Sequence, residues 1–121
     1  MLRIWIAIAF LATLTGCAAP TMYQWGDYEK DLYGAYKDPT KMNALRIDLE
    51  SQTALMEGSR QTVAPGLYAE LGTLYLQLGS PEKAINMYKK ERDAWPESRG
   101  LMTSMIQNIE RRQKDKQVSS K

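Results

Sequence analysis

Cysteine and histidine, the residues that most often carry nucleophilic or metal chemistry, are almost absent from this chain. Among its 121 residues Cys17 is the single cysteine, and there is no histidine. An internal disulfide, a Cys/His zinc site and a nucleophile–histidine pair therefore cannot be assembled. We predict a protein with no catalytic residue, no metal and no cofactor, in which Cys17 is the one side chain with a distinct chemical role.

Three acidic residues that alternate along the chain, Asp27, Glu29 and Asp31, form the other set that could do chemistry. Calcium-binding loops use such spacing, but they also need a central glycine and a terminal glutamate that this stretch lacks. Acidic side chains are favoured in the first turn of a helix, where they interact with the helix dipole. We interpret these residues as first-turn acids and predict no metal site.

The segment before Cys17 is typical of a secretory signal peptide. Arg3 gives it a positive start, and residues 4–14 form an uncharged apolar run that ends in small residues. This run is too short to span a bilayer, which takes about 20 residues. The sequence predicts a cleaved signal peptide over residues 1–16.

The four residues from Leu14 to Cys17 resemble the bacterial lipobox, where the signal is cut before a cysteine that then becomes lipid-modified. The resemblance implies that Cys17 carries a diacylglycerol and an N-linked acyl chain such as palmitate, which together would hold the protein firmly in a membrane. An ordinary signal peptide with an incidental cysteine and an uncleaved anchor are the two alternatives.

Residues 17–22 form a predicted lipidated tether. Residue 18 is alanine; in the sorting rule of Gram-negative lipoproteins an aspartate there favours retention at the inner membrane. The resemblance therefore implies an outer-membrane lipoprotein that faces the periplasm of a Gram-negative host. Residues 18–22 span at most about 17 Å when fully extended, so we expect the domain to stay close to its membrane, in a compartment without nucleic acid.

Helical periodicity without any strand pattern predicts an all-α domain of about five short helices over residues 23–113. The predicted breaks lie at Asp38-Pro39, Gly58, Gly79-Ser80-Pro81 and Pro96. The predicted buried faces are Tyr28, Leu32 and Tyr36; Met42, Leu45, Leu49 and Met56; and Leu101, Met105 (with Met102) and Ile109. Residues 114–121 are basic and hold Val118 as their one apolar side chain, and we predict a disordered tail there.

The stretch from Pro65 to Ser98 has the residue spacing of one tetratricopeptide unit. Its anchor positions are Tyr68, Leu71, Gly72, Tyr75, Ala84, Tyr88 and Pro96. The resemblance implies a helical hairpin that buries its apolar face against the flanking helices. Glu91 departs from the motif, which has a small alanine there. Ala69 and Thr73 stand where carboxylate-binding repeats carry lysine and asparagine, so we predict no carboxylate clamp.

A wider resemblance covers residues 23–102. It rests on Tyr23-Gln24-Trp25-Gly26, Tyr28, residues 67–72, 74–75 and 78–79, and Trp95-Pro96-Glu97-Ser98, which are similar to a family of small bacterial lipoproteins of unknown function. Members of this family are often encoded beside lipoproteins similar to the curli export pore. This resemblance implies a role in assembling or stabilising an envelope or secretion complex, with such a lipoprotein as a partner.

Five aromatic residues lie between positions 23 and 36. Trp25, Tyr28 and Tyr36, with Leu32, are predicted to pack as core, because an aromatic stripe at helical spacing is usually buried. The alternative is that these aromatic residues form a partner-binding surface or an aromatic belt at the membrane headgroups. Tyr23 and Tyr33 lie off that stripe and are the candidate partner-binding residues.

These observations favour a non-catalytic protein–protein interaction module without a small-molecule substrate. A lipoprotein cofactor of a cell-wall (peptidoglycan) synthase is the alternative within the class of binding proteins. A small enzyme is the third hypothesis, and the missing histidine and the acylated cysteine oppose it.

Overall fold

The structure is a computed structural model that describes residues 23, 25 and 27–120. Within this part the chain forms α2 (Tyr28–Lys37), α3 (Met42–Gly58), α4 (Leu67–Gln77), α5 (Pro81–Ala94) and α6 (Arg99–Ser119), with 3-10 turns at Pro39–Lys41 and Pro96–Ser98. No strand occurs in the described part, so the prediction of an all-α fold with about five helices is confirmed. The signal peptide, Cys17 and the tether lie outside the described residues.

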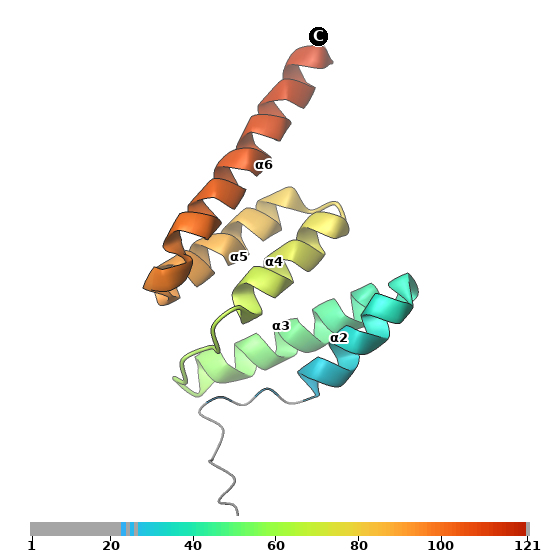
Figure 1. Cartoon of the computed structure of the whole chain (residues 1–121), viewed down its shortest axis with the longest axis vertical. Helices are drawn as coiled ribbons and strands as arrows, with labels where there is room; N and C mark the ends of the chain where they lie inside the picture. Colours follow the sequence, from blue (N-terminus) through green and yellow to red (C-terminus); the bar gives the residue numbers. More distant parts are fainter. Residues whose placement is uncertain (1–22, 24, 26, 121) are drawn as a thin grey trace, which may run out of the picture.

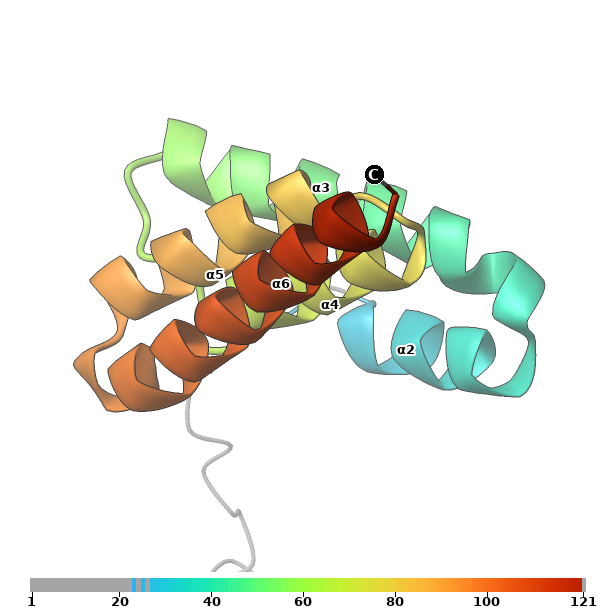
Figure 2. The same cartoon turned by 90° about the horizontal axis from the view of Figure 1, so that it is seen from above.

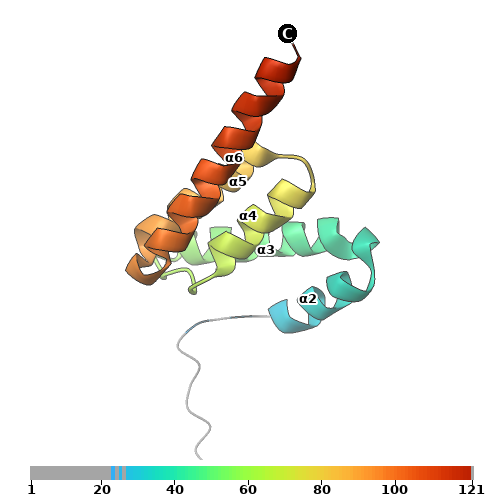
Figure 3. The ribbon, with the colours of Figure 1, turned by 45° about the horizontal axis from the view of Figure 1, so that its top comes forward.

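Consecutive helices pack against one another, α2 on α3, α3 on α4, α4 on α5 and α5 on α6 (Figure 1). The most extensive contact joins α4 and α5. Seen from above, α2 lies at one side of the molecule and the start of α6 at the other (Figure 2). The C-terminal half of α6 extends beyond the other helices (Figure 3). The described chain is thus a row of helices in which α2 packs mainly on α3 and α6 packs mainly on α5.

The helix boundaries follow local signals that the sequence shows. The Asp38 carboxylate accepts a hydrogen bond of 3.0 Å from the Thr40 backbone N–H, and Pro39 begins the 3-10 turn that leads into α3. Gly79 adopts a φ of 79° in the turn before α5, and Pro81 is the first residue of α5. The predicted breaks at these positions and at Pro96 are confirmed.

The centre of the core is the contact between α4 and α5. Tyr88 is fully buried there, and its ring lies against Gly72. A Cβ atom added to Gly72 would come within 2.8 Å of the Tyr88 ring and 3.2 Å of the Ala84 carbonyl oxygen. Glycine at position 72 therefore allows the two helices to approach closely, as the tetratricopeptide spacing implies.

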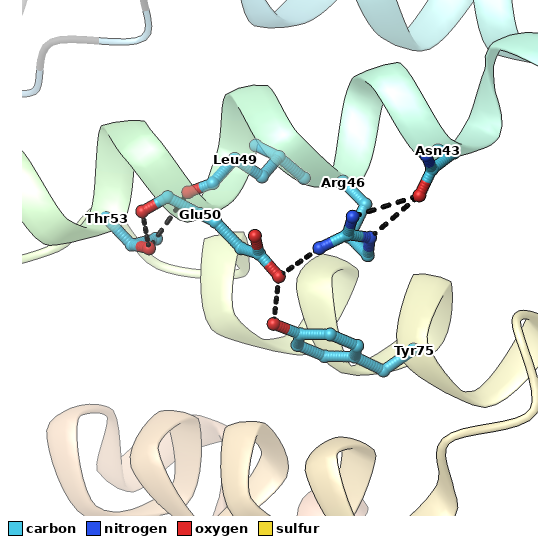
Figure 4. A network of polar contacts seen from close by, with 6 residues as sticks. All are labelled: Asn43, Arg46, Leu49, Glu50, Thr53 and Tyr75. Atoms are coloured by element: carbon cyan, nitrogen blue, oxygen red, sulfur yellow. Dashed lines mark hydrogen bonds and ion pairs between the residues drawn. The ribbon is translucent and has the colours of Figure 1, made fainter.

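Two equivalent polar contacts join α3, α4 and α5. In the first, Glu50 of α3 accepts hydrogen bonds from the Tyr75 hydroxyl and from Arg46 (Figure 4). The Lys83 ammonium of α5 lies 5.3 Å from the centre of the Tyr75 ring. These side chains attach the hairpin to α3 at one end.

The second contact repeats the first one seven residues away on each helix. Glu57 accepts a hydrogen bond of 2.5 Å from the Tyr68 hydroxyl and one of 2.7 Å from the Lys90 ammonium. The Lys90 ammonium again lies 5.3 Å from the tyrosine ring centre. Seven residues make about two helical turns, so both contacts lie on the same face of each helix. The two motif tyrosines therefore pack through their rings and also bind α3 through their hydroxyls.

Glu91, the departure from the repeat motif, is 1% exposed at the C-terminal end of α5. Its Oε1 atom accepts hydrogen bonds from the Gly66 backbone N–H, at 2.8 Å, and from the Ser98 hydroxyl, at 3.2 Å. Glu91 thus connects the start of α4 with the turn that leads into α6, a role that alanine could not fill.

Three expectations from the sequence are wrong in detail. Tyr36 is 89% exposed, because α2 packs with a narrow face on which Ala35 is the buried residue. Leu101 is 64% exposed, while Met102, Ile106 and Ile109 are buried against α5. Residues 114–119 continue α6 instead of forming a disordered tail, because arginine, lysine and glutamine are good helix formers and no glycine or proline interrupts them.

Candidate binding surface

The motif residues and the candidate partner-binding residues lie in different parts of the fold. Six of the seven motif residues are buried where α4 and α5 meet: Tyr68, Leu71, Gly72, Tyr75, Ala84 and Tyr88. The seventh, Pro96, begins the exposed turn after α5. These residues stabilise the fold, and their side chains do not gather polar groups at a shared site on the surface. Cys17 lies outside the described residues.

Tyr23 belongs to an aromatic cluster. Its ring centre lies 6.5 Å from that of Trp25 and 6.0 Å from that of Trp95, both in edge-on contact. Tyr28 continues the cluster, 5.8 Å from Trp25, and the Trp95 indole N–H donates a hydrogen bond of 3.2 Å to the Val63 carbonyl. Tyr23 therefore fixes the start of the domain to the end of α5.

Tyr33 lies apart from this cluster on α2. It is 62% exposed, and the Lys37 ammonium lies 4.6 Å from the centre of its ring. The structure does not bring Tyr23 and Tyr33 together. Of the two candidate partner-binding residues, Tyr33 presents the freely accessible ring.

A long groove runs between α2 and the middle and C-terminal part of α3. It has a volume of about 790 Å³ and is lined by Asp27, Tyr28, Asp31, Leu45, Asp48, Leu49, Ser51, Gln52, Leu55, Met56, Ser59 and Gln61. We call it the outer groove. A hollow of about 280 Å³ shares Asp31, Leu45 and Asp48 with it and reaches Tyr33. Tyr33 therefore stands at one end of a continuous surface.

The outer groove combines an apolar floor with an acidic rim. Leu45, Leu49 and Met56 belong to the core and supply the floor. Asp27, Asp31 and Asp48 supply the rim, and none of their carboxylates forms a hydrogen bond or ion pair with another described residue. Among the described residues, no lysine or arginine lines the 790 Å³ groove. Its surface is therefore suited to an apolar partner that carries positive charge.

A smaller pocket lies on the other side of α2, where α2, α3 and α4 meet. Its volume is about 230 Å³, and its lining is Leu32, Ala35, Tyr36, Pro39, Met42, Leu45, Glu70, Leu74 and Gln77. We call it the inner pocket. Glu70 is the one charged side chain among the described residues that line it, and burial raises the pKa of this carboxyl. Burial, with the nearby Glu70 as the lesser cause, also raises the pKa of Tyr28.

The described residues offer binding groups rather than reactive ones. No three of their histidine, cysteine, aspartate or glutamate side chains gather closely enough to hold a metal ion. None of the helices that the structure describes has the length and hydropathy needed to cross a bilayer. Of the hollows beside α2, the outer groove and the inner pocket are therefore the two that we consider for function.

Comparison with protein families decides which group of proteins this chain falls into. The model described as "Domain of unknown function (DUF4810)" matches residues 22–105. The chain belongs to this family. A search of curated proteins and a search of solved structures each found no match. The DUF4810 match includes α2 to α5 entirely and ends within α6, so it contains both hollows.

Two polar residues of this DUF4810 domain were not singled out from the sequence. Asp48 joins Asp27 and Asp31 at the outer groove, and Glu70 enters the inner pocket. The sequence does show Asp27 and Asp31 four residues apart, which puts both on one helical face. It gives no signal for Asp48 or Glu70, because their positions depend on how α3 and α4 meet α2.

Proposed function

We propose that this protein is a non-catalytic protein–protein interaction module, held at the outer membrane by lipid on Cys17 and facing the periplasm. In this proposal it helps to assemble or stabilise an envelope or secretion complex. The observation that carries the proposal is the outer groove, with its apolar floor and its rim of three aspartates that form no ion pair with another described residue. Membership of a family whose function is unknown leaves such a role open.

The shape of the outer groove suits an amphipathic helix or an extended segment. Helix-in-groove recognition places an apolar stripe against an apolar floor. Charges at the rim guide association and favour partners of opposite sign. A partner segment with leucine-like residues on one face and lysine or arginine along its edge would satisfy both parts of the groove. The tetratricopeptide-like spacing of α4 and α5 supports the same class of function, since such repeats commonly serve as binding scaffolds.

The short distance to the anchor favours a partner at the same membrane. Tyr23 is already packed on Trp95, so residues 18–22 are the chain left between Cys17 and the folded domain. Five residues reach at most about 17 Å. A membrane-associated subunit, such as a lipoprotein similar to the curli export pore, lies within that reach.

The anchor is tested by Cys17→Ala in a Gram-negative host. Wild type is expected to take up radiolabelled palmitate and to fractionate with the outer membrane, whereas the variant takes up none. Label that persists in Cys17→Ala would contradict lipidation at this residue. Arg60→Ala, an exposed change in the connector between α3 and α4, is the control and keeps both label and location.

The interaction is tested with a photo-crosslinking amino acid at position 33 of the full-length protein in intact cells. We expect a discrete adduct with another envelope protein, because Tyr33 is exposed at the hollow that adjoins the outer groove. The same amino acid at position 86, exposed on α5, is the matched control and should not give this adduct. No adduct from position 33, or equal adducts from both positions, would exclude α2 as the docking element.

A further inference from the structure

The Glu70 side chain lacks an interaction that a carboxylate normally has. It is half-buried, and it forms no hydrogen bond or ion pair with another described residue. Burial without a compensating donor disfavours the charged form, in agreement with the raised pKa of this group. A positively charged group beside Glu70 would stabilise the ionised carboxylate in this half-buried position.

The surroundings of Glu70 define what kind of cation the inner pocket would accept. Leu32, Met42 and Leu74 give it apolar walls, and the Gln77 amide lies two helical turns along α4 from Glu70. A volume of about 230 Å³ is enough for one long side chain and too small for a helix. A single carboxylate also falls short of the several oxygen ligands that a divalent metal ion needs.

We propose that the inner pocket binds the side chain of a lysine or arginine from a partner, with its apolar stem between Leu32 and Leu74 and its cationic head on Glu70. Arginine suits the site particularly well, because a guanidinium can form two parallel hydrogen bonds with one carboxylate. Lysine and arginine commonly bury their methylene stems along apolar surface. Tyr36, 89% exposed at the mouth of the pocket, offers an aromatic face to the same cation.

This site has the opposite charge to the carboxylate clamp of peptide-binding repeats. Ala69 and Thr73 provide no cation on α4, and Glu70 between them provides an anion. The inference rests on the proposed function in that the cation is taken to come from a protein partner. The inference adds that the partner is recognised at the inner pocket through a lysine or arginine side chain.

The test uses the purified full-length lipidated protein in detergent micelles, with ¹³C-labelled methyl groups, and two small probes of the same shape. The probes are n-butylguanidinium, which is charged, and n-butylurea, which is neutral. Methyl signals of Leu32, Met42 and Leu74 should shift with n-butylguanidinium, at a dissociation constant roughly tenfold lower than that for n-butylurea. Equal binding of the two probes, or shifts confined to other parts of the protein, would overturn the proposal.

Two variants assign the preference for the cation to Glu70. Glu70→Gln keeps the size of the side chain and should bring the two probes to similar dissociation constants. Glu82→Gln, an exposed change on α5, is the control and should keep the roughly tenfold difference between the two dissociation constants. Gln77→Glu adds a second carboxylate at the pocket and should tighten n-butylguanidinium binding. Retained discrimination in Glu70→Gln would overturn the assignment.

Failure of this inference can be told apart from failure of the proposed function. If n-butylguanidinium binds as expected but position 33 forms no adduct in cells, the pocket is correct and the proposed role of α2 in partner binding is wrong. If position 33 forms its adduct and the pocket does not prefer the cation, the interaction module stands and the inference about Glu70 is wrong.

Discussion

The backbone N–H of Gly66 donates a hydrogen bond of 2.8 Å to the carboxylate of Glu91, 25 residues further along the chain. This bond closes the hairpin at its open end, where α4 begins and α5 finishes. Through Ser98 the same carboxylate oxygen also holds the turn into α6. The residue that departs from the repeat motif therefore connects three helices.

Glu91→Ala is expected to lower the free energy of unfolding by about 2 kcal/mol, because it removes two hydrogen bonds that a buried side chain accepts and leaves a cavity. Glu91→Gln keeps an acceptor oxygen for the Gly66 N–H and should lower the free energy of unfolding by less. Urea unfolding followed by circular dichroism at 222 nm measures both. Glu97→Ala, exposed in the next turn, is the control, and an equal effect of Glu97→Ala and Glu91→Ala would contradict this role.

Gly72→Leu is expected to be much more harmful than Gly79→Ala. A side chain at position 72 would overlap the Tyr88 ring, whereas nothing lies within 4 Å of a Cβ at position 79. Gly72→Leu should cost about 3 kcal/mol or prevent folding. Gly79→Ala should cost about 1 kcal/mol, because its φ of 79° is unfavourable for a residue with a side chain. Similar melting temperatures for the two variants would show that α4 and α5 do not pair through Gly72.

Tyr68→Phe is expected to weaken the dependence of stability on acid pH. Hydrogen bonds from Lys90 and Tyr68 hold the pKa of Glu57 below its ordinary value of 4.5. The stabilisation from Glu57 is therefore complete above about pH 4.5 and is lost as the pH falls through the lower pKa of the folded state. Tyr68→Phe should cost about 1 kcal/mol at neutral pH and reduce the loss between pH 5 and 3. Tyr33→Phe, whose hydroxyl has no carboxylate partner among the described residues, should behave as wild type.

Tyr23→Ala is expected to destabilise the domain more than Tyr36→Ala does. Tyr23 makes edge-on contacts with two tryptophan rings, each worth about 0.5 to 1.5 kcal/mol. Tyr36 is 89% exposed, so its removal should change stability by less than about 0.5 kcal/mol. Thermal unfolding of both variants checks the order, and a greater loss for Tyr36→Ala would mean that α2 packs by another face.

Local signals allowed much of the fold to be predicted from the sequence. Prolines at 39, 81 and 96 mark three boundaries because proline fixes φ and cannot continue a preceding helix. Leu45, Leu49 and Met56 of the second helix were predicted to be buried, and they are.

The wrong predictions concern which of two adjacent faces a neighbour covers. Leu101 with Met105 and Met102 with Ile106 are both apolar pairs four residues apart, so periodicity fits either face. The position of α5 decides for Met102 and Ile106, and no local pattern contains that information. The prediction that Tyr36 is buried is wrong for the same reason, since α2 packs on α3 with the face that carries Ala35.

The candidate binding surface was predictable only in part. Tyr33 could be identified as accessible because it stands off the apolar stripe of its helix. Asp48 and Glu70 come from two other helices, and their approach to α2 is a matter of tertiary packing. The sequence therefore indicated Tyr33 and the two acids Asp27 and Asp31, but neither Asp48 nor Glu70.

The central claim, that the outer groove binds a protein partner, is tested most directly by reversing its charge in the full-length protein. Asp31→Lys with Asp48→Lys replaces two rim carboxylates by ammonium groups. Glu97→Lys with Glu110→Lys, both exposed outside either hollow, is the control with the same change in net charge. The measurement is the yield of the crosslinked adduct from position 33 in intact cells, with helicity and melting temperature confirmed unchanged. We expect the groove variant to lose the adduct roughly tenfold or more and the control to keep it; an undiminished adduct in the groove variant, or an equal loss in both, would contradict the account.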